Sequence, residues 1–107
     1  NNSNSVDYPI YGQKVGLAVT KNIADCGIIV CGSGIGISIA ANKIKNIRAA
    51  LCTSISHSEM SRRHNDANVL CLAADGPLDS DYISILDTWL ATEFEGGRHQ
   101  RRVDLMR

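Results

Sequence analysis

Cys26-Gly-Ile-Ile-Val-Cys31-Gly-Ser-Gly-Ile-Gly36 is the stretch that decides how this chain folds. Its first six residues form a short apolar run after Asp25, which is the pattern of a strand buried on both faces. The glycines that follow break the strand, and Ile35, Ile39 and Ala40 then recur at helical spacing. A buried strand, a glycine loop and a helix in this order indicate parallel α/β structure.

The same alternation continues on both sides of this stretch. Asp7 is expected to cap a helix that carries Pro9 in its first turn. The elements expected from apolar spacing are a helix at 9–21, a strand at 47–52, a helix at 56–64 and a strand at 68–72. The pattern predicts the α/β class, as one Rossmann-like domain over residues 1–107 with a parallel sheet between two helical layers.

The two ends of the chain differ in character. Residues 1–5 are small and polar and resemble a linker. An amphipathic helix is expected after the Gly76-Pro77 turn, and residues 97–107 are expected to form a basic C-terminal helix. The apolar stripe predicted for the amphipathic helix consists of Tyr82, Ile83, Leu86, Trp89 and Leu90.

The composition argues against several classes of partner. Eleven Lys and Arg balance eleven Asp and Glu, so the overall charge offers no long-range attraction for nucleic acid or an anionic membrane. No run approaches the roughly 18 to 20 apolar residues of a membrane span. The four cysteines lie in apolar runs without a CxxC pair, which argues against disulfides and a zinc site and favours the reducing cytoplasm.

The glycine loop lies beyond the carboxyl end of a predicted strand, where α/β sheets bind ligands. It does not match a dinucleotide site, because Ile37 stands where a third glycine is required and no acid follows the next strand. It is not a Walker loop either, since no Gly-Lys-Ser/Thr follows. What remains is the Cys31 thiol beside a helix N-terminus, whose partial positive charge favours the reactive thiolate. Cys31 is therefore a candidate base or nucleophile, against the alternative of one more buried cysteine, which is our interpretation of the other three.

Two polar clusters are further candidates. His64, Asn65 and Asp66 lie between a helix end and a strand, although a histidine there is more often a cation at a helix terminus. Arg98 and Arg102 are four residues apart, so both guanidinium groups share one helical face and could hold a phosphate. A solvated basic tail is the alternative, and a nucleic-acid patch a weaker one.

Five motifs together resemble one family, ribose-5-phosphate isomerase type B, in order and spacing. The motifs are Asp7-Tyr-Pro, Cys31-Gly-Ser-Gly-Ile-Gly-Ile-Ser-Ile-Ala-Ala-Asn-Lys43, Ile47-Arg-Ala-Ala-Leu-Cys52, Ser61-Arg-Arg-His-Asn-Asp-Ala-Asn-Val69 and Glu95-Gly-Gly-Arg-His99. The resemblance implies an aldose–ketose isomerase that interconverts ribose 5-phosphate and ribulose 5-phosphate through an enediolate, without a metal or other cofactor.

The resemblance also implies roles for the matching residues. Cys31 matches the catalytic base, Ser33 stands where the family has Thr or Ser, and His64 matches the residue that opens the sugar ring. The residues that match substrate contacts are Tyr8, Tyr11, Gly32, Gly34, Ile35, Gly36, Asn65, Arg98 and Arg102. A galactose-6-phosphate isomerase subunit and a non-catalytic phosphosugar-binding subunit remain as alternatives.

The predicted topology places Cys31 and His64 at opposite edges of the sheet, because one ends a strand and the other precedes one. A sugar therefore cannot easily touch both within one chain, and we expect a two-fold dimer with shared active sites, the step to a tetramer being left open. Two departures from the family stand out. Its usual first strand, with an Asp-His pair, is expected outside this chain together with a helix and a second strand, and Asp75 replaces the usual arginine.

Overall fold

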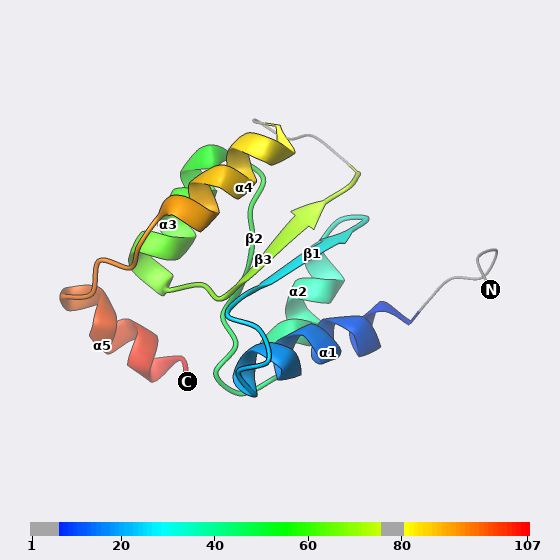
Figure 1. The fold of residues 1–107 in the computed structure, drawn as a ribbon, viewed down its shortest axis with the longest axis horizontal. Coiled ribbons are helices and arrows are strands. Elements are labelled where there is room, and N and C mark those ends of the chain that lie inside the picture. Colours follow the sequence, from blue (N-terminus) through cyan, green and yellow to red (C-terminus); the bar gives the residue numbers. More distant parts are fainter. Residues whose placement is uncertain (1–6, 76–80) are drawn as a thin grey trace.

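A computed structural model of the protein describes residues 7–75 and 81–107. Its elements in chain order are α1 Tyr8–Thr20, β1 Gly27–Cys31, α2 Ile35–Asn42, β2 Ala49–Leu51, α3 Ile55–Asn65, β3 Val69–Ala73, α4 Tyr82–Ala91 and α5 Arg98–Leu105. The strands lie between α1 and α2 on one face and α3 and α4 on the other, with α5 beyond the end of α3 (Figure 1). The predicted three-layer α/β/α arrangement is confirmed.

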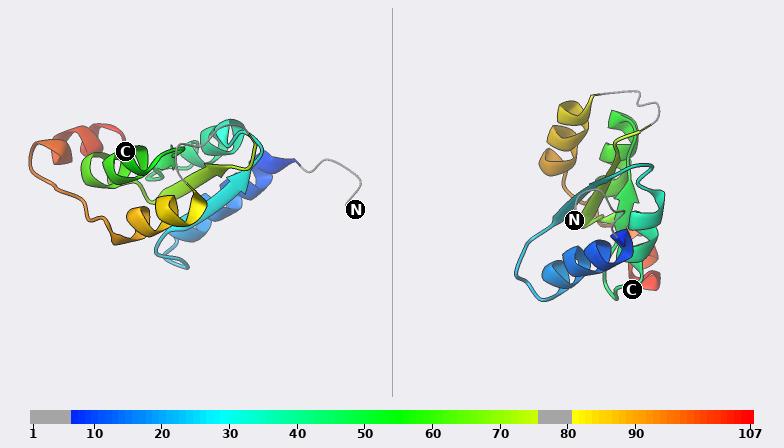
Figure 2. Two further views of the ribbon diagram at one scale, coloured as in Figure 1. Left: turned by 90° about the horizontal axis from the view of Figure 1, so that it is seen from above. Right: turned by 90° about the vertical axis from the view of Figure 1, so that its right-hand side faces the viewer.

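The sheet of the described residues has the strand order β1-β3-β2, and both strand pairs are parallel. Within it, Gly27 and Ala49 both pair with Val69, while Cys31 pairs with Ala73. The amino ends of the strands therefore meet at one edge of the sheet and their carboxyl ends at the other. The same layering is visible from two further directions (Figure 2).

Two apolar cores lie on the two faces of the sheet. Ile29 and Cys71 point toward α1 and α2, where they pack with Val19 and Ile37. On the other face, Leu70 and Leu72 pack with Cys52, Ala67, Ile85 and Trp89. Every residue of β3 is buried, which explains why its sequence reads as a continuous apolar run rather than an alternating one.

The helix ends follow the local capping chemistry. The Ser54 hydroxyl accepts a hydrogen bond from the backbone N–H of His57 at 3.1 Å, and the Asp81 carboxylate accepts one from Ser84 at 2.7 Å. Asp7 occupies the cap position of α1, but its side chain makes no capping hydrogen bond. The predicted side-chain cap at Asp7 is therefore wrong, although the helix begins within one residue of the predicted start.

Two other details of the sequence interpretation need correction. The strand expected at 47–52 is shorter, since β2 spans Ala49–Leu51. On α4, Ile83 and Leu90 are 71% and 57% exposed, whereas Ile85, outside the predicted stripe, is fully buried. Ile85 and Trp89, four residues apart, form the side of α4 that meets the sheet. The predicted Gly76-Pro77 turn lies outside the described residues.

The two outermost strands of the described sheet, β2 and β1, differ in how their unpaired sides are covered. At β2, the Asn42 side chain donates to the carbonyl of Ala49 at 3.0 Å and accepts from its N–H at 2.7 Å. These bonds satisfy backbone groups on the unpaired side of β2. β1 pairs only with β3 among the described residues, and its Ile28 and Val30 side chains are 43% and 57% exposed. Across both described ranges, no helix has the length and apolar character needed to cross a membrane.

Candidate active site

The Cys31 loop lies at the carboxyl end of β1, where the chain turns from the strand into α2. Cys31 is partly buried and packs against one core, whereas Ser33 is exposed. The loop continues the sheet beyond β3, since the N–H of Ala74 donates to the Cys31 carbonyl at 2.8 Å and that of Asp75 to the Gly32 carbonyl at 2.9 Å. The N-terminus of α2 and the partly buried Cys31 thus meet at the carboxyl end of the sheet.

Glycine is required at two positions of this loop. Gly34 has φ 76°, and a Cβ there would come within 2.5 Å of Leu51 Cδ1 and 3.4 Å of the Leu72 backbone. A Cβ on Gly36 would overlap the Tyr8 hydroxyl. The loop is therefore packed against β2 and α1, and Tyr8 lies beside it.

Other predicted substrate residues lie around this loop in different ways. The Ser33 hydroxyl accepts a hydrogen bond from the Ile35 N–H at 3.2 Å, so it orders the start of α2. Tyr11, one turn after Tyr8 on α1, is half exposed, with the Lys14 ammonium 5.4 Å from its ring centroid. Asp75 Oδ2 lies only 3.3 Å from the position of a Cβ on Gly32, so its carboxylate borders the loop.

The other cysteines are not equivalent to Cys31. Burial raises the pKa of the Cys52 thiol, and burial together with the neighbouring Cys52 and Cys31 thiols raises the pKa of Cys71 to about 12. Both are packed in the cores, as expected for structural cysteines. Cys26 is only half-buried, so its expected burial is partial.

The opposite edge of the sheet carries a second group of candidate residues, at the end of α3. The His64 ring stacks on that of His99 with centroids 4.2 Å apart and an interplanar angle of 15°. His99 Nε2 lies 3.5 Å from Glu95 Oε1, and Glu95 Oε2 is paired with Arg63. We name His64, Glu95 and His99 the histidine cluster.

The predicted arginines belong to the same region. Arg98 and Arg102 are exposed on α5, and both contribute to lowering the pKa of His99, after burial and the nearby His64. Their charges therefore act on His99, the residue on which His64 stacks. The sequence interpretation quoted Glu95 and His99 in one motif but gave neither a role. No helical spacing rule relates them, because Glu95 precedes α5.

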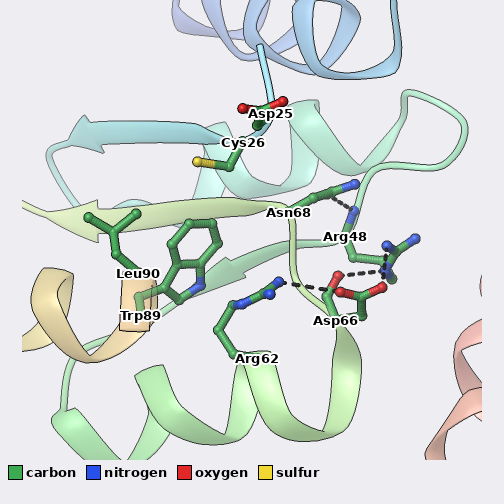
Figure 3. A pocket seen from close by; sticks show the side chains of 8 residues that line it. All are labelled: Asp25, Cys26, Arg48, Arg62, Asp66, Asn68, Trp89 and Leu90. Carbon is green, nitrogen blue, oxygen red and sulfur yellow. Dashed lines mark hydrogen bonds and ion pairs between the residues drawn. The ribbon is translucent and has the colours of Figure 1, made fainter. Parts of the chain in front are cut away.

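A network of ion pairs holds the end of α3 in place (Figure 3). Asp66, in the left-handed region with φ 48°, ends the helix. Its carboxylate lies 3.4 Å from Arg48 and 3.3 Å from Arg62, and Arg48 Nε also donates to the carbonyls of Asn65 and Asp66 at 3.1 and 2.9 Å. The exposed Asn65 side chain is thus carried on a fixed backbone beside His64.

Two cavities stand out in the described part of the chain, and Cys31 lines neither. One, of about 400 Å³, is lined by Asp25, Cys26, Arg48, Arg62, Asp66, Asn68, Trp89 and Leu90 (Figure 3). The other, of about 380 Å³, is lined by Asn42, Ile47, Arg48, Ala49, Ala50, Asn65 and Met106. The arginines of the first cavity are already engaged by Asp66 and by backbone carbonyls, which indicates a structural role there rather than a reaction site.

Comparison with known proteins places this chain and its fold in one class, the sugar isomerases. The family model described as Ribose/Galactose Isomerase matches residues 1–106, and the chain belongs to this family. A curated relative, ribose-5-phosphate isomerase B of Escherichia coli, is 46% identical over 102 residues, covering 95% of this chain and 68% of the relative. The chain spans about two thirds of the length of the curated relatives it matches.

Solved structures agree with this assignment. The ribose-5-phosphate isomerase B of Clostridium thermocellum is 51% identical, with a TM-score of 0.92 over 96% of this chain and 70% of that one. The enzyme of Mycoplasma genitalium with bound ribulose-5-phosphate is 45% identical, with a TM-score of 0.88 over 95% of this chain and 68% of that one. The suspected family is confirmed, and with it the isomerase class.

Proposed function

We propose that the protein is an aldose–ketose isomerase that interconverts ribose 5-phosphate and ribulose 5-phosphate. The observation that carries the proposal is the half-buried Cys31 thiol at the carboxyl end of β1, directly before the glycine loop and the N-terminus of α2. The relatives named as ribose-5-phosphate isomerases, one with ribulose-5-phosphate bound, support the choice of substrate. The four free cysteines support the expected reducing, cytoplasmic location.

The proposed reaction requires a base and hydrogen-bond donors to the oxygen that becomes negatively charged. His64 opens the furanose ring by proton transfer. The Cys31 thiolate then removes the proton from C2 of the open-chain aldose, and the C–H electrons form the C1–C2 double bond while negative charge collects on O1. Backbone N–H groups of the glycine loop stabilise this enediolate, each donor contributing about 3 kcal/mol. The hydroxyl proton of O2 then moves to O1, and the Cys31 thiol returns the first proton to C1. The O2–H electrons form the carbonyl at C2, which completes the ketose.

Each remaining predicted contact receives a role in this proposal. Ser33 orders the loop through its bond to the Ile35 N–H, and Tyr8 and Tyr11 border the sugar. Asn65 contacts the enediolate, and Arg98 and Arg102 hold the phosphate.

A second copy of the chain is part of the proposal. Cys31 is in register with Ala73 at one end of β3, whereas His64 precedes Val69 at the other end. The strand alone separates these ends by roughly 13 Å, so we place His64 and Asn65 of one subunit against the Cys31 loop of its partner in a two-fold dimer. Ile35 and Ile39, 55% and 56% exposed on α2 next to the loop, support an apolar contact there.

The test of the reaction is conversion of ribose 5-phosphate by the full-length protein. The Cys31→Ala variant is expected to lose about a hundredfold or more in kcat, because general-base catalysis typically contributes that much. Cys26→Ala is the matched control, since it removes a half-buried thiol at the other end of β1. Near-normal turnover of Cys31→Ala would refute the assignment of the base.

Mixing two inactive variants tests the shared site. When Cys31→Ala and His64→Asn chains are unfolded and refolded together, half of the random dimers carry one intact site of two, so about a quarter of native activity is expected to return. Sites contained within single chains would give no recovery.

Asp75 motivates a second candidate, a phosphosugar-binding subunit without isomerase activity. Its carboxylate beside Gly32 places negative charge at the loop proposed to stabilise an anion. Binding of ribose 5-phosphate without turnover by the native protein, and turnover gained by Asp75→Arg, would favour this candidate. Galactose 6-phosphate belongs in the same assay, because the family description names both sugars.

A further inference from the structure

The histidine cluster gathers three metal-binding side chains at one place. One donor atom from each of His64, Glu95 and His99 lies within 4.8 Å of the others. These residues come from the end of α3, from the segment after α4 and from the first turn of α5. Helices α3 and α5 pack against each other (Figure 1). We propose that the histidine cluster binds a divalent transition-metal ion such as Zn²⁺, which blocks His64 when it is bound.

The donor set suits this class of ion. Two imidazole nitrogens and one carboxylate oxygen are a common three-ligand set for Zn²⁺, with a fourth position left for water. Zinc–nitrogen bonds of about 2.1 Å bring tetrahedral donors to roughly 3.4 Å from one another. His99 Nε2 and Glu95 Oε1 are already 3.5 Å apart, so binding requires mainly a tilt of the half-buried His64 ring out of its stack.

The Glu95 carboxylate is held in the orientation needed for metal binding by a contact to its second oxygen, Oε2. Arg63 pairs with Glu95 Oε2, which leaves Oε1 directed toward His99. The backbone is held as well, because the Glu95 N–H donates to the Arg63 carbonyl at 3.0 Å. His99 is only 6% exposed, so packing fixes its ring. Outer contacts of this kind position metal ligands and strengthen binding.

The positive charges nearby limit which ions can bind. Arg63, Arg98 and Arg102 surround a cluster with a single carboxylate, which opposes any cation. Ions held mainly by oxygen ligands, such as Mg²⁺ and Ca²⁺, gain too little from one carboxylate to overcome this charge. Ions with a strong preference for imidazole, such as Zn²⁺, Co²⁺ and Ni²⁺, are therefore the expected occupants.

Co²⁺ titration of the tag-free, full-length protein tests the site directly. One equivalent is expected to bind and to give the visible absorption of low-coordinate cobalt, which Zn²⁺ displaces and Mg²⁺ does not. Glu95→Gln and His64→Asn are expected to weaken binding at least about tenfold. Neither residue is in the core, so folding is expected to persist, and circular dichroism checks it.

The matched control is His57→Asn, which removes the third histidine of the chain, exposed in the first turn of α3. It is expected to bind Co²⁺ as the native protein does. Failure of the native protein to bind Co²⁺, or equal binding by the native, Glu95→Gln and His64→Asn proteins, overturns the proposal.

The inhibitory consequence rests on the proposed role of His64 and is measured separately. Zn²⁺ is expected to inhibit ribose 5-phosphate conversion by the native and His57→Asn proteins, and EDTA to restore it. Co²⁺ binding lost in Glu95→Gln supports the metal site even where the isomerase activity is absent. Isomerase activity without Co²⁺ binding overturns the metal site and leaves the proposed function standing.

Discussion

The two edges of the sheet carry the two halves of the candidate site, and they are built differently. At the carboxyl edge, the Cys31 loop is shaped by backbone hydrogen bonds and by glycines that allow close packing against Leu51 and Tyr8. At the amino edge, side-chain ion pairs around Asp66 and the histidine cluster join α3 to β2 and α5. One half depends on the absence of side chains, and the other on charged and aromatic partners.

The two halves of the candidate site are therefore expected to tolerate different substitutions. A loop shaped by close packing is sensitive to added volume, because protein interiors leave few voids. An edge held by partly exposed ion pairs is sensitive to loss of charge, but each pair contributes only modestly. Substitutions that add volume at the loop should therefore cost more stability than substitutions that remove one charge around Asp66.

The largest difference is expected in thiol reactivity. Cys71, in the middle of β3, has a pKa raised to about 12, mainly by burial, so at about pH 8 its thiolate is roughly a thousandfold scarcer than that of a free cysteine. Iodoacetamide is therefore expected to modify the partly exposed Cys31 in the native protein and to leave the buried Cys71 unmodified, as measured by peptide mass spectrometry. In denaturant both are expected to react alike, and native modification of Cys71 would show that the sheet opens readily.

Adding one methyl group to a glycine in each half of the candidate site compares how closely the two halves are packed. Gly34 and Gly96 both have positive φ, 76° and 69°, but a Cβ on Gly34 would overlap Leu51 whereas one on Gly96 meets nothing within 4 Å. Gly96→Ala is expected to lower the free energy of unfolding by about 1 kcal/mol through backbone strain alone. Gly34→Ala is expected to cost about 3 kcal/mol, because overpacking adds to that strain. Equal costs in urea titrations would contradict the close packing of the loop.

How much the sequence could predict follows the same division. The carboxyl edge is encoded locally, because the apolar run to Cys31 and the glycines after it are consecutive, and both the strand end and the loop were placed correctly. The stack of His64 on His99 joins residues 35 positions apart, and no spacing rule of a single helix or strand relates them. The resemblance supplied the role of His64, but the partner that fixes its ring came only from the fold.

The faces of α4 show a second limit of the sequence. Several overlapping apolar stripes run along α4 at helical spacing, formed by Ile83, Ile85, Leu86, Trp89 and Leu90. Which stripe is buried depends on the rotation of α4 about its own axis. The structure buries Ile85 and Trp89. Periodicity therefore established that the helix exists, but not how it is rotated.

Removing one charge at the amino edge is expected to have a moderate effect. Asp66→Asn keeps a residue suited to the left-handed backbone but loses the ion pairs to Arg48 and Arg62, at 3.4 and 3.3 Å. These groups are partly buried, so about 1 to 2 kcal/mol of unfolding free energy is expected to be lost. Glu59→Gln, which breaks the exposed pair to Arg63 at 3.5 Å, is the control and is expected to cost less than about 0.5 kcal/mol. A cost for Asp66→Asn no greater than for Glu59→Gln would mean that the network does not hold this edge.

The smallest expected effect is a pH dependence of stability from the histidine cluster. The pKa of His99 is lowered from its ordinary value of 6.5, by burial first and then by the charges of His64, Arg98 and Arg102, while Glu95 acts in the opposite direction. The unfolded chain therefore binds a proton at a pH where the folded chain does not. Stability from the neutral ring is complete above about pH 6.5 and decreases as the pH falls toward the lowered folded pKa.

Urea titrations at about pH 7.5 and 5.5, both with EDTA, measure this decrease as a lower midpoint at the acidic pH. The pKa of Glu95 is also lowered, by its bond to Arg63, but its contribution is lost only below its ordinary value of 4.5 and so lies outside this window. His99→Asn is expected to reduce the pH dependence, and His57→Asn to preserve it. An equal decrease of the midpoint in the native and His99→Asn proteins would show that His99 does not carry the pH dependence.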